Sequence, residues 1–245
     1  MFSDYAALIV LLPVIAFVFT LFLGKKLYSG GALLPIAAIA GSFIISLGIF
    51  LEIYPEGMVQ QSVSWFAGMN LGILIDPLAV VMLMMVSFVS LLIHIYAVGY
   101  MSHDPARPRY FAETSLFTAA MLSVILSDNI LQFFISWELV GLCSFLLIGF
   151  WYHKPSAAAA AKKAFLVTRV GDVLFLAGIV LLYVNMKLLV DNGTLVVESQ
   201  SFILQFKTMF EAIPLINGTQ LTYITLNIAA VNSDVSAKYR GFAGS

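Results

Sequence analysis

The stretch ILQFFISWELVGLCSFLLIGFW, residues 130–151, decides how this sequence folds. A helix needs about 20 apolar residues to cross a hydrocarbon core about 30 Å thick. The stretch supplies that length and contains one charged side chain, Glu138. At a rise of about 1.5 Å per residue, Glu138 lies about 12 Å into the core. The sequence therefore predicts a membrane-spanning helix that holds a carboxylate inside the bilayer.

The rest of the chain has the composition of a multi-pass membrane protein. Of its 245 residues, 61% are hydrophobic and 10% are charged, and the mean hydropathy is +1.00. Soluble domains average roughly 25% charged residues. The predicted fold class is therefore all-α, a polytopic transmembrane bundle. Six complete helices are predicted, at residues 5–23, 32–51, 77–99, 110–127, 130–151 and 157–183.

The segments between these helices carry turn signals. Ser-Asp-Asn at 127–129 predicts a tight turn that makes the fourth and fifth helices a hairpin. The loop 53–76 contains SVSWFAGMNLGILI, which favours a short β-hairpin, and Asp-Asn-Gly at 191–193 is another turn signal.

The C-terminal part of the sequence is less regular. Residues 212–231, AIPLINGTQLTYITLNIAAV, could begin a partial seventh helix, whereas residues 231–245 form a polar tail without an expected role. We expect residues 1–230 to be the N-terminal part of a larger membrane domain that is truncated at its C-terminus.

Basic side chains gather in alternate loops. The side rich in Lys and Arg is expected to face the cytoplasm, which places the N-terminus outside. The first apolar stretch lacks a basic leader and a small-residue cleavage site, so we interpret it as a helix and not as a removed signal peptide. The predicted cytoplasmic side holds Lys25, Lys26, Arg107, Arg109, Lys154, Lys162 and Lys163.

Charged residues inside the predicted spans are the candidate functional residues. A charge at the centre of a membrane helix costs about 2.5 to 3.5 kcal/mol on insertion scales, so such groups usually face a partner or a water-filled cavity. Arg169 and Asp172 stand three residues apart, about 18 to 23 Å into the sixth helix. With Glu138, Lys162 and Lys163 they predict one polar layer able to relay protons.

Each candidate also has a structural interpretation. Glu138 could be protonated in a helix interface, Lys162 and Lys163 could be interfacial anchors, and Arg169 with Asp172 could be a structural ion pair. His94, late in the third helix, is a weak relay candidate.

Cofactor and metal motifs are not found in the sequence. The chain has a single cysteine, Cys143, and neither GxGxxG nor GxxxxGK[ST] occurs. A net charge of -1 without a basic run gives no reason to expect a nucleic-acid partner. We therefore expect no cofactor, no metal site and no redox centre on this chain.

Residues 100–178 resemble a known family. The motifs WELVGLCSFLLIGFW (137–151), AKKAF (161–165) and RVGD (169–172) are similar to the signature region of the large antiporter-like subunit of respiratory complex I, its fifth or L-type chain. F420H2 dehydrogenases and multisubunit Na+/H+ antiporters have the same region in their large subunits. The resemblance extends over residues 1–230.

The resemblance implies a channel module of two inverted five-helix repeats, each with a broken helix. Protons would move along mid-membrane charges, here Glu138, Lys162, Lys163, Arg169 and Asp172. Flavin, iron–sulfur clusters and quinone or methanophenazine would belong to partner subunits. The family pairs its glutamate with a lysine in a GKSAQFP-like motif on the seventh helix, and this motif is absent from the sequence.

The expected function is that of a non-redox, proton-translocating subunit of an NADH-quinone or F420H2 dehydrogenase in the plasma membrane of a prokaryote. Its expected partners are the lipid bilayer, other membrane subunits, and protons or Na+. The alternatives are a subunit of a multisubunit Na+/H+ antiporter and a non-transporting assembly subunit. The sequence leaves the electron donor open between NADH and F420H2.

Overall fold

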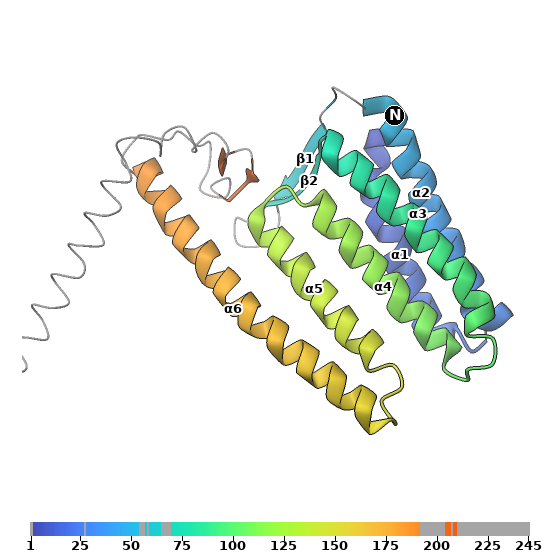
Figure 1. Ribbon diagram of the computed structural model, residues 1–245. Coiled ribbons are helices and arrows are strands. Elements are labelled where there is room, and N and C mark those ends of the chain that lie inside the picture. Colours follow the sequence, from blue (N-terminus) through green and yellow to red (C-terminus); the bar gives the residue numbers. More distant parts are fainter. Residues whose placement is uncertain are drawn as a thin grey trace, which may run out of the picture. The chain divides into compact units, whose positions relative to one another are not determined.

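The described residues consist of helices and one two-stranded β-hairpin (Figure 1). The computed structural model describes residues 2–26, 28–53, 57, 59–64, 70–191, 204–206, 208 and 209. It divides into two compact units, Met1–Ala177 and Gly178–Ser245. The helices are α1 (Ala6–Leu23), α2 (Leu33–Ile53), α3 (Pro77–Tyr100), α4 (Arg107–Leu126), α5 (Ile130–Ile148) and α6 (Pro155–Asp191), and short 3-10 turns occupy Phe2–Tyr5 and Tyr28–Gly31.

Capping residues explain where several helices begin. The Asp76 carboxylate accepts a 2.6 Å hydrogen bond from the backbone N–H of Ala79, and the Asn129 side chain accepts one of 2.8 Å from Gln132. Such bonds satisfy N–H groups that the first turn of a helix leaves free. Proline begins both α3 and α6, where its missing N–H costs no helical bond. α6 ends at Asp191, beyond the predicted end at residue 183.

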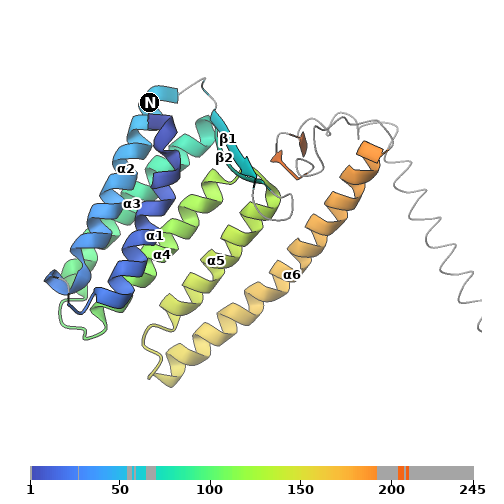
Figure 2. The same ribbon diagram turned by 180° about the vertical axis from the view of Figure 1, so that it is seen from behind.

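The first four helices close into a ring. α1 packs against α2 and α4, α2 packs against α3, and α3 packs against α4, while α5 lies on the outer side of α4 (Figure 2). Small hydroxyl side chains join neighbouring helices. Ser42 donates a 2.9 Å bond to the Ile9 carbonyl, and the Ser90 and Thr118 hydroxyls lie 2.6 Å apart. Small residues allow such close approach where lipid supplies no hydrophobic force between helices.

α4 is the interior helix of this unit. Of the helices in the described residues, the five other than α4 are long and apolar enough to cross a membrane. α4 coincides with the predicted span at 110–127 but is less apolar, and its polar side chains Glu113, Thr114, Ser115 and Thr118 are buried. Because α1, α3 and α5 pack around it, its polar groups face protein and need not face lipid.

The predicted β-hairpin and the predicted tight turn are both confirmed, and they contact one another. Strands β1 (Val59–Ser64) and β2 (Asn70–Ile75) pair antiparallel, with Val59 opposite Ile75. The Gln132 side chain accepts a bond from the Gly72 N–H at 3.0 Å and donates one to the Gly72 carbonyl at 2.9 Å. The hairpin is therefore attached to the first turn of α5.

An apolar cluster lies near this hairpin, where Ile9, Ile49, Leu83 and Leu122 are fully buried. Many other apolar side chains on the helices are exposed, as expected for surfaces that face lipid. The predicted start of a seventh helix, the tail at 231–245 and most of the Asp-Asn-Gly turn at 191–193 lie outside the described residues.

Candidate functional site

Arg169 on α6 lies between two carboxylates. Its Nη1 atom forms an ion pair with the Glu138 carboxylate on α5 and lies 3.3 Å from Oδ2 of Asp172, one turn further along α6. Its Nη2 atom donates a 3.4 Å hydrogen bond to the Glu138 backbone carbonyl. Three of the five predicted relay residues therefore meet in one cluster.

Aromatic and small residues hold the Arg169 guanidinium in place. Its Cζ atom lies 4.4 Å from the centre of the Phe165 ring, and that ring lies 5.1 Å from the Phe145 ring of α5. A cation over an aromatic face is electrostatically favoured. A Cβ atom at Gly141 would lie 3.6 Å from Nη2 of Arg169, so the guanidinium packs closely against this position of α5.

The charges of the cluster do not cancel. With both carboxylates ionised, Glu138 and Asp172 outnumber Arg169 and leave one negative charge. Asp172 is 8% exposed, and the Glu138 and Arg169 side chains are each 27% exposed. An uncompensated charge among apolar groups is costly. The cluster therefore places an unbalanced negative charge between two helices.

Lys162 and Lys163 do not join this cluster, and their role in the polar layer stays a prediction. Both side chains are exposed, and neither forms an ion pair within the described residues. The helical rotation explains their exposure, because Ala161 is the residue of this turn that faces α5. It is 2% exposed and lies 3.3 Å from the position of a Cβ atom at Gly149.

His94 is buried between α3 and α4 and not beside Glu138. Its ring is 1% exposed, Nδ1 lies 2.8 Å from the Ser90 carbonyl, and its centre lies 6.1 Å from that of Phe111. Nε2 has no hydrogen-bond partner in the part of the chain that the structure describes. These contacts lie on α3 and α4 and do not include Glu138, Arg169 or Asp172.

Glu113 is a buried acid that is not among the predicted site residues. It is 7% exposed, and its Oε1 atom lies 3.1 Å from Nε of Arg109, one turn earlier on α4. The signal was present in RPRYFAE, since residues four apart on a helix are neighbours. Its other oxygen, Oε2, has no hydrogen-bond partner within the described residues.

Two family models match the sequence and together cover more than half of it. One is described as NADH-Ubiquinone oxidoreductase (complex I), chain 5 N-terminus, and matches residues 65–111. The other is described as NADH:quinone oxidoreductase/Mrp antiporter, TM, and matches residues 127–229. The second match includes the whole Glu138, Arg169 and Asp172 cluster.

Curated relatives are similar over most of the chain. F(420)H(2) dehydrogenase subunit L of Methanosarcina mazei is 60% identical over 229 residues, which is 93% of this chain and 34% of the relative. NADH-quinone oxidoreductase subunit L of Mycobacterium tuberculosis is 41% identical over 190 residues, 74% of this chain and 30% of the relative. The chain thus spans about a third of the length of these relatives.

Solved structures share the fold. The Mrp complex from Dietzia sp. superposes with a TM-score of 0.62 at 25% identity, over 77% of this chain and 20% of that one. A chain of the membrane-bound sulfane sulfur reductase, an archaeal respiratory membrane complex, gives a TM-score of 0.62 at 22% identity, over 73% and 37%. The second likeness concerns the fold alone.

Proposed function

Because the chain belongs to the family of antiporter-like membrane subunits that complex I shares with Mrp antiporters, we propose that it translocates protons as a membrane subunit of a respiratory dehydrogenase. It would carry no redox centre of its own. Electron transfer would take place on partner subunits that hold flavin, iron–sulfur clusters and quinone or methanophenazine. The proposed location is the plasma membrane of a prokaryote, among other membrane subunits.

The ion pair between Glu138 and Arg169 is the observation that carries this proposal. It joins α5 to α6, and together with Asp172 it forms a cluster with one more negative than positive charge, which one proton would neutralise. If a positive charge arrives nearby and attracts Glu138 away from Arg169, Arg169 keeps its contact with Asp172 at 3.3 Å. Arg169 can thus exchange one carboxylate for the other without losing all compensation, and this exchange would couple proton uptake to a nearby charge.

The electron donor is proposed to be F420H2. The relative from Methanosarcina mazei, named F(420)H(2) dehydrogenase subunit L, is 60% identical, against 41% for the NADH-quinone oxidoreductase subunit L. Identification of the subunits that co-purify with this chain tests the assignment. A co-purified NADH-binding subunit would contradict it.

Substitution Glu138→Gln in the assembled complex tests the function. We expect proton translocation into membrane vesicles to be lost, while electron transfer from the donor to a soluble acceptor continues. Glu52→Gln is a matched control, because it removes a carboxylate at the end of α2 that accepts a 2.8 Å bond from the Phe2 N–H. Normal translocation with Glu138→Gln would refute the proposal.

A second candidate function is that of a subunit of a Na+/H+ antiporter. The likeness to the Mrp complex and the description of the second family model favour it. In that case an imposed Na+ gradient would drive proton movement in vesicles without an electron donor. Proton movement that depends on the donor and not on Na+ would exclude this candidate.

A variant of the charged cluster distinguishes a subunit that serves only in assembly from the two transport functions above. Replacing Glu138, Arg169 and Asp172 together by leucine removes the whole charged cluster while keeping apolar bulk. Replacement of buried ion pairs by apolar residues is often neutral for stability. A variant that assembles and still translocates protons would indicate that these charges only hold helices together.

A further inference from the structure

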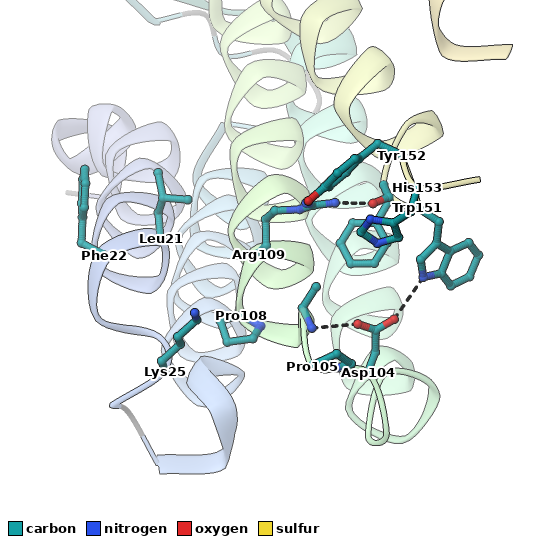
Figure 3. Close-up of a pocket in the computed structure, with 12 residues that line it drawn as sticks. Leu21, Phe22, Lys25, Asp104, Pro105, Pro108, Arg109, Trp151, Tyr152 and His153 are labelled. Carbon is teal, nitrogen blue, oxygen red and sulfur yellow. Dashed lines mark hydrogen bonds between the residues drawn. The ribbon is translucent and has the colours of Figure 1, made fainter. Parts of the chain in front are cut away.

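A pocket of about 760 Å³ opens at the end of the helical bundle that carries the basic loops (Figure 3). It is bounded by the last turn of α1, the start of α4 and the segment that follows α5. The apolar spans containing α1 and α5 end at Leu23 and Ile148. The pocket therefore lies at the level where a hydrocarbon core gives way to lipid headgroups. None of the proposed relay residues lines it.

Two cationic side chains line the pocket from different helices, Lys25 just after α1 and Arg109 in α4. Lys25 is exposed and forms no ion pair within the described residues. Arg109 is fixed: Nη2 donates a hydrogen bond to the Phe150 carbonyl, Nε lies 3.1 Å from Glu113, and Cζ lies 4.5 Å from the centre of the Phe150 ring. Its Nη1 atom has no recorded partner in the described part of the chain.

The pocket is also lined by one acidic residue, Asp104, whose carboxylate already accepts two hydrogen bonds. Asp104 accepts a 3.0 Å bond from the Trp151 indole and a 2.8 Å bond from the Ala106 N–H. The indole hydrogen bond is the main cause of a lowered pKa at Asp104. Asp104 thus stays ionised and holds Trp151 at the pocket wall, and Figure 3 shows it on the side away from Lys25.

The wall beside Lys25 is apolar. Leu21 and Phe22 of α1 line the pocket, and Phe22 is 78% exposed, among the most exposed large apolar side chains of the described residues. Figure 3 shows Trp151 and Tyr152 on the opposite wall. Tryptophan and tyrosine concentrate at membrane interfaces because one edge of the ring is apolar and the other is polar. The pocket therefore joins a cationic region to an apolar wall that continues onto the lipid-facing side of α1.

We propose that this pocket binds one phospholipid. Lys25 and Arg109 hold the headgroup phosphate, while an acyl chain lies along Leu21 and Phe22 and passes beside Trp151. A soluble anion would use only the cations and would leave the exposed apolar wall uncovered. A lipid without phosphate would use only the wall. The combination of both features in one pocket favours a phospholipid.

Quenching of Trp151 fluorescence tests the proposal. The full chain, with Trp65→Phe and Trp137→Phe, retains one of its three tryptophans and is titrated in detergent with phosphatidylglycerol that carries brominated acyl chains. We expect saturable quenching. Diacylglycerol with the same brominated chains lacks the phosphate and should quench only weakly.

The variant Lys25→Gln should raise the half-saturating phosphatidylglycerol concentration about fivefold, the effect of one basic residue near an anionic lipid surface. Lys26→Gln is the matched control, because it removes the same charge from the next exposed residue, which does not line the pocket. It should leave the titration unchanged. A circular dichroism spectrum equal to that of the parent confirms that each variant is folded.

Three results would overturn the proposal. Equal quenching by diacylglycerol would show that the phosphate is not recognised. Equal shifts with Lys25→Gln and Lys26→Gln would show a general surface-charge effect. Protection from quenching by millimolar inorganic phosphate would assign the pocket to free phosphate and not to a lipid.

Discussion

Arg169 packs against α5 at Gly141, where a small side chain fits but a large one does not. A Cβ atom there would lie 3.6 Å from Nη2 of Arg169, which is an ordinary contact. We therefore expect Gly141→Ala to preserve the ion pair and, because alanine favours helix, to stabilise the chain by about 0.5 to 1 kcal/mol. Gly141→Leu should instead displace the guanidinium and lower the thermal unfolding temperature in detergent.

Gly171→Leu provides the control for this pair of variants, since a Cβ atom at Gly171 meets nothing within 4 Å among the described residues. It should change the unfolding temperature little. Equal destabilisation by leucine at both glycines would contradict the steric role assigned to Gly141.

Arg169 compensates two carboxylates at once. Its removal should therefore destabilise the fold more than removal of either acid. Arg169→Gln leaves Glu138 and Asp172 charged and without their cation, and we expect a loss of about 3 kcal/mol in the free energy of unfolding. Glu138→Gln leaves the contact of Arg169 with Asp172 at 3.3 Å, so its cost should be smaller. Chemical denaturation in detergent measures both, and equal losses would contradict the shared arrangement.

The hydrogen bond between Asp104 and Trp151 in the proposed lipid pocket should depend on pH. The Trp151 indole, followed by the Ala106 N–H, lowers the pKa of Asp104 below its ordinary value. Because the pKa of Asp104 is lower in the folded chain, its ionised form stabilises the fold at pH values above the ordinary aspartate pKa of about 4. This stabilisation is lost as the pH falls through the lowered pKa. Trp151 fluorescence in the single-tryptophan chain should therefore change below about pH 4. An identical titration in Asp104→Asn would contradict this cause.

At the level of the elements, Gln132 attaches the β-hairpin to the bundle. Its two bonds to Gly72, of 3.0 and 2.9 Å, link β2 to the first turn of α5. Gln132→Ala leaves both backbone groups of Gly72 without this partner, at a cost of about 1 to 3 kcal/mol. We expect faster hydrogen exchange in residues 70–75. Gln61→Ala removes an exposed glutamine of β1, and similar exchange in both variants would rule out the attachment.

Elements that depend on local signals were predictable from the sequence. Pro155 marks the start of α6, and the Ser-Asp-Asn turn gives the hairpin of α4 and α5. Features that depend on packing were not predictable. From its hydropathy alone, α4 looks like a weak membrane span. The sequence does not show that its polar residues, such as Glu113, are buried, because the helices that cover them are distant in sequence. Likewise, which of Ala161, Lys162 and Lys163 faces α5 depends on the rotation of α6, and the structure selects the alanine.

At the scale of the whole molecule, charge is distributed between the two ends of the helices. Lys25, Arg107, Arg109 and Lys154 lie in or beside the connections α1 to α2, α3 to α4 and α5 to α6. The α2 to α3 and α4 to α5 connections carry acidic residues instead, Asp76 and Asp128 among them. Basic connections usually remain in the cytoplasm, so the hairpin of β1 and β2 should lie outside the cell.

Cysteine labelling decides this orientation. The only native cysteine, Cys143, is fully buried, so it should not react with a membrane-impermeant maleimide. His103 and Gln61 are exposed residues of opposite connections. In intact cells we expect labelling of Gln61→Cys but not of His103→Cys, and in inverted vesicles the reverse. Labelling of His103→Cys in intact cells would place the basic connections outside, and the lipid pocket would then face the outer leaflet.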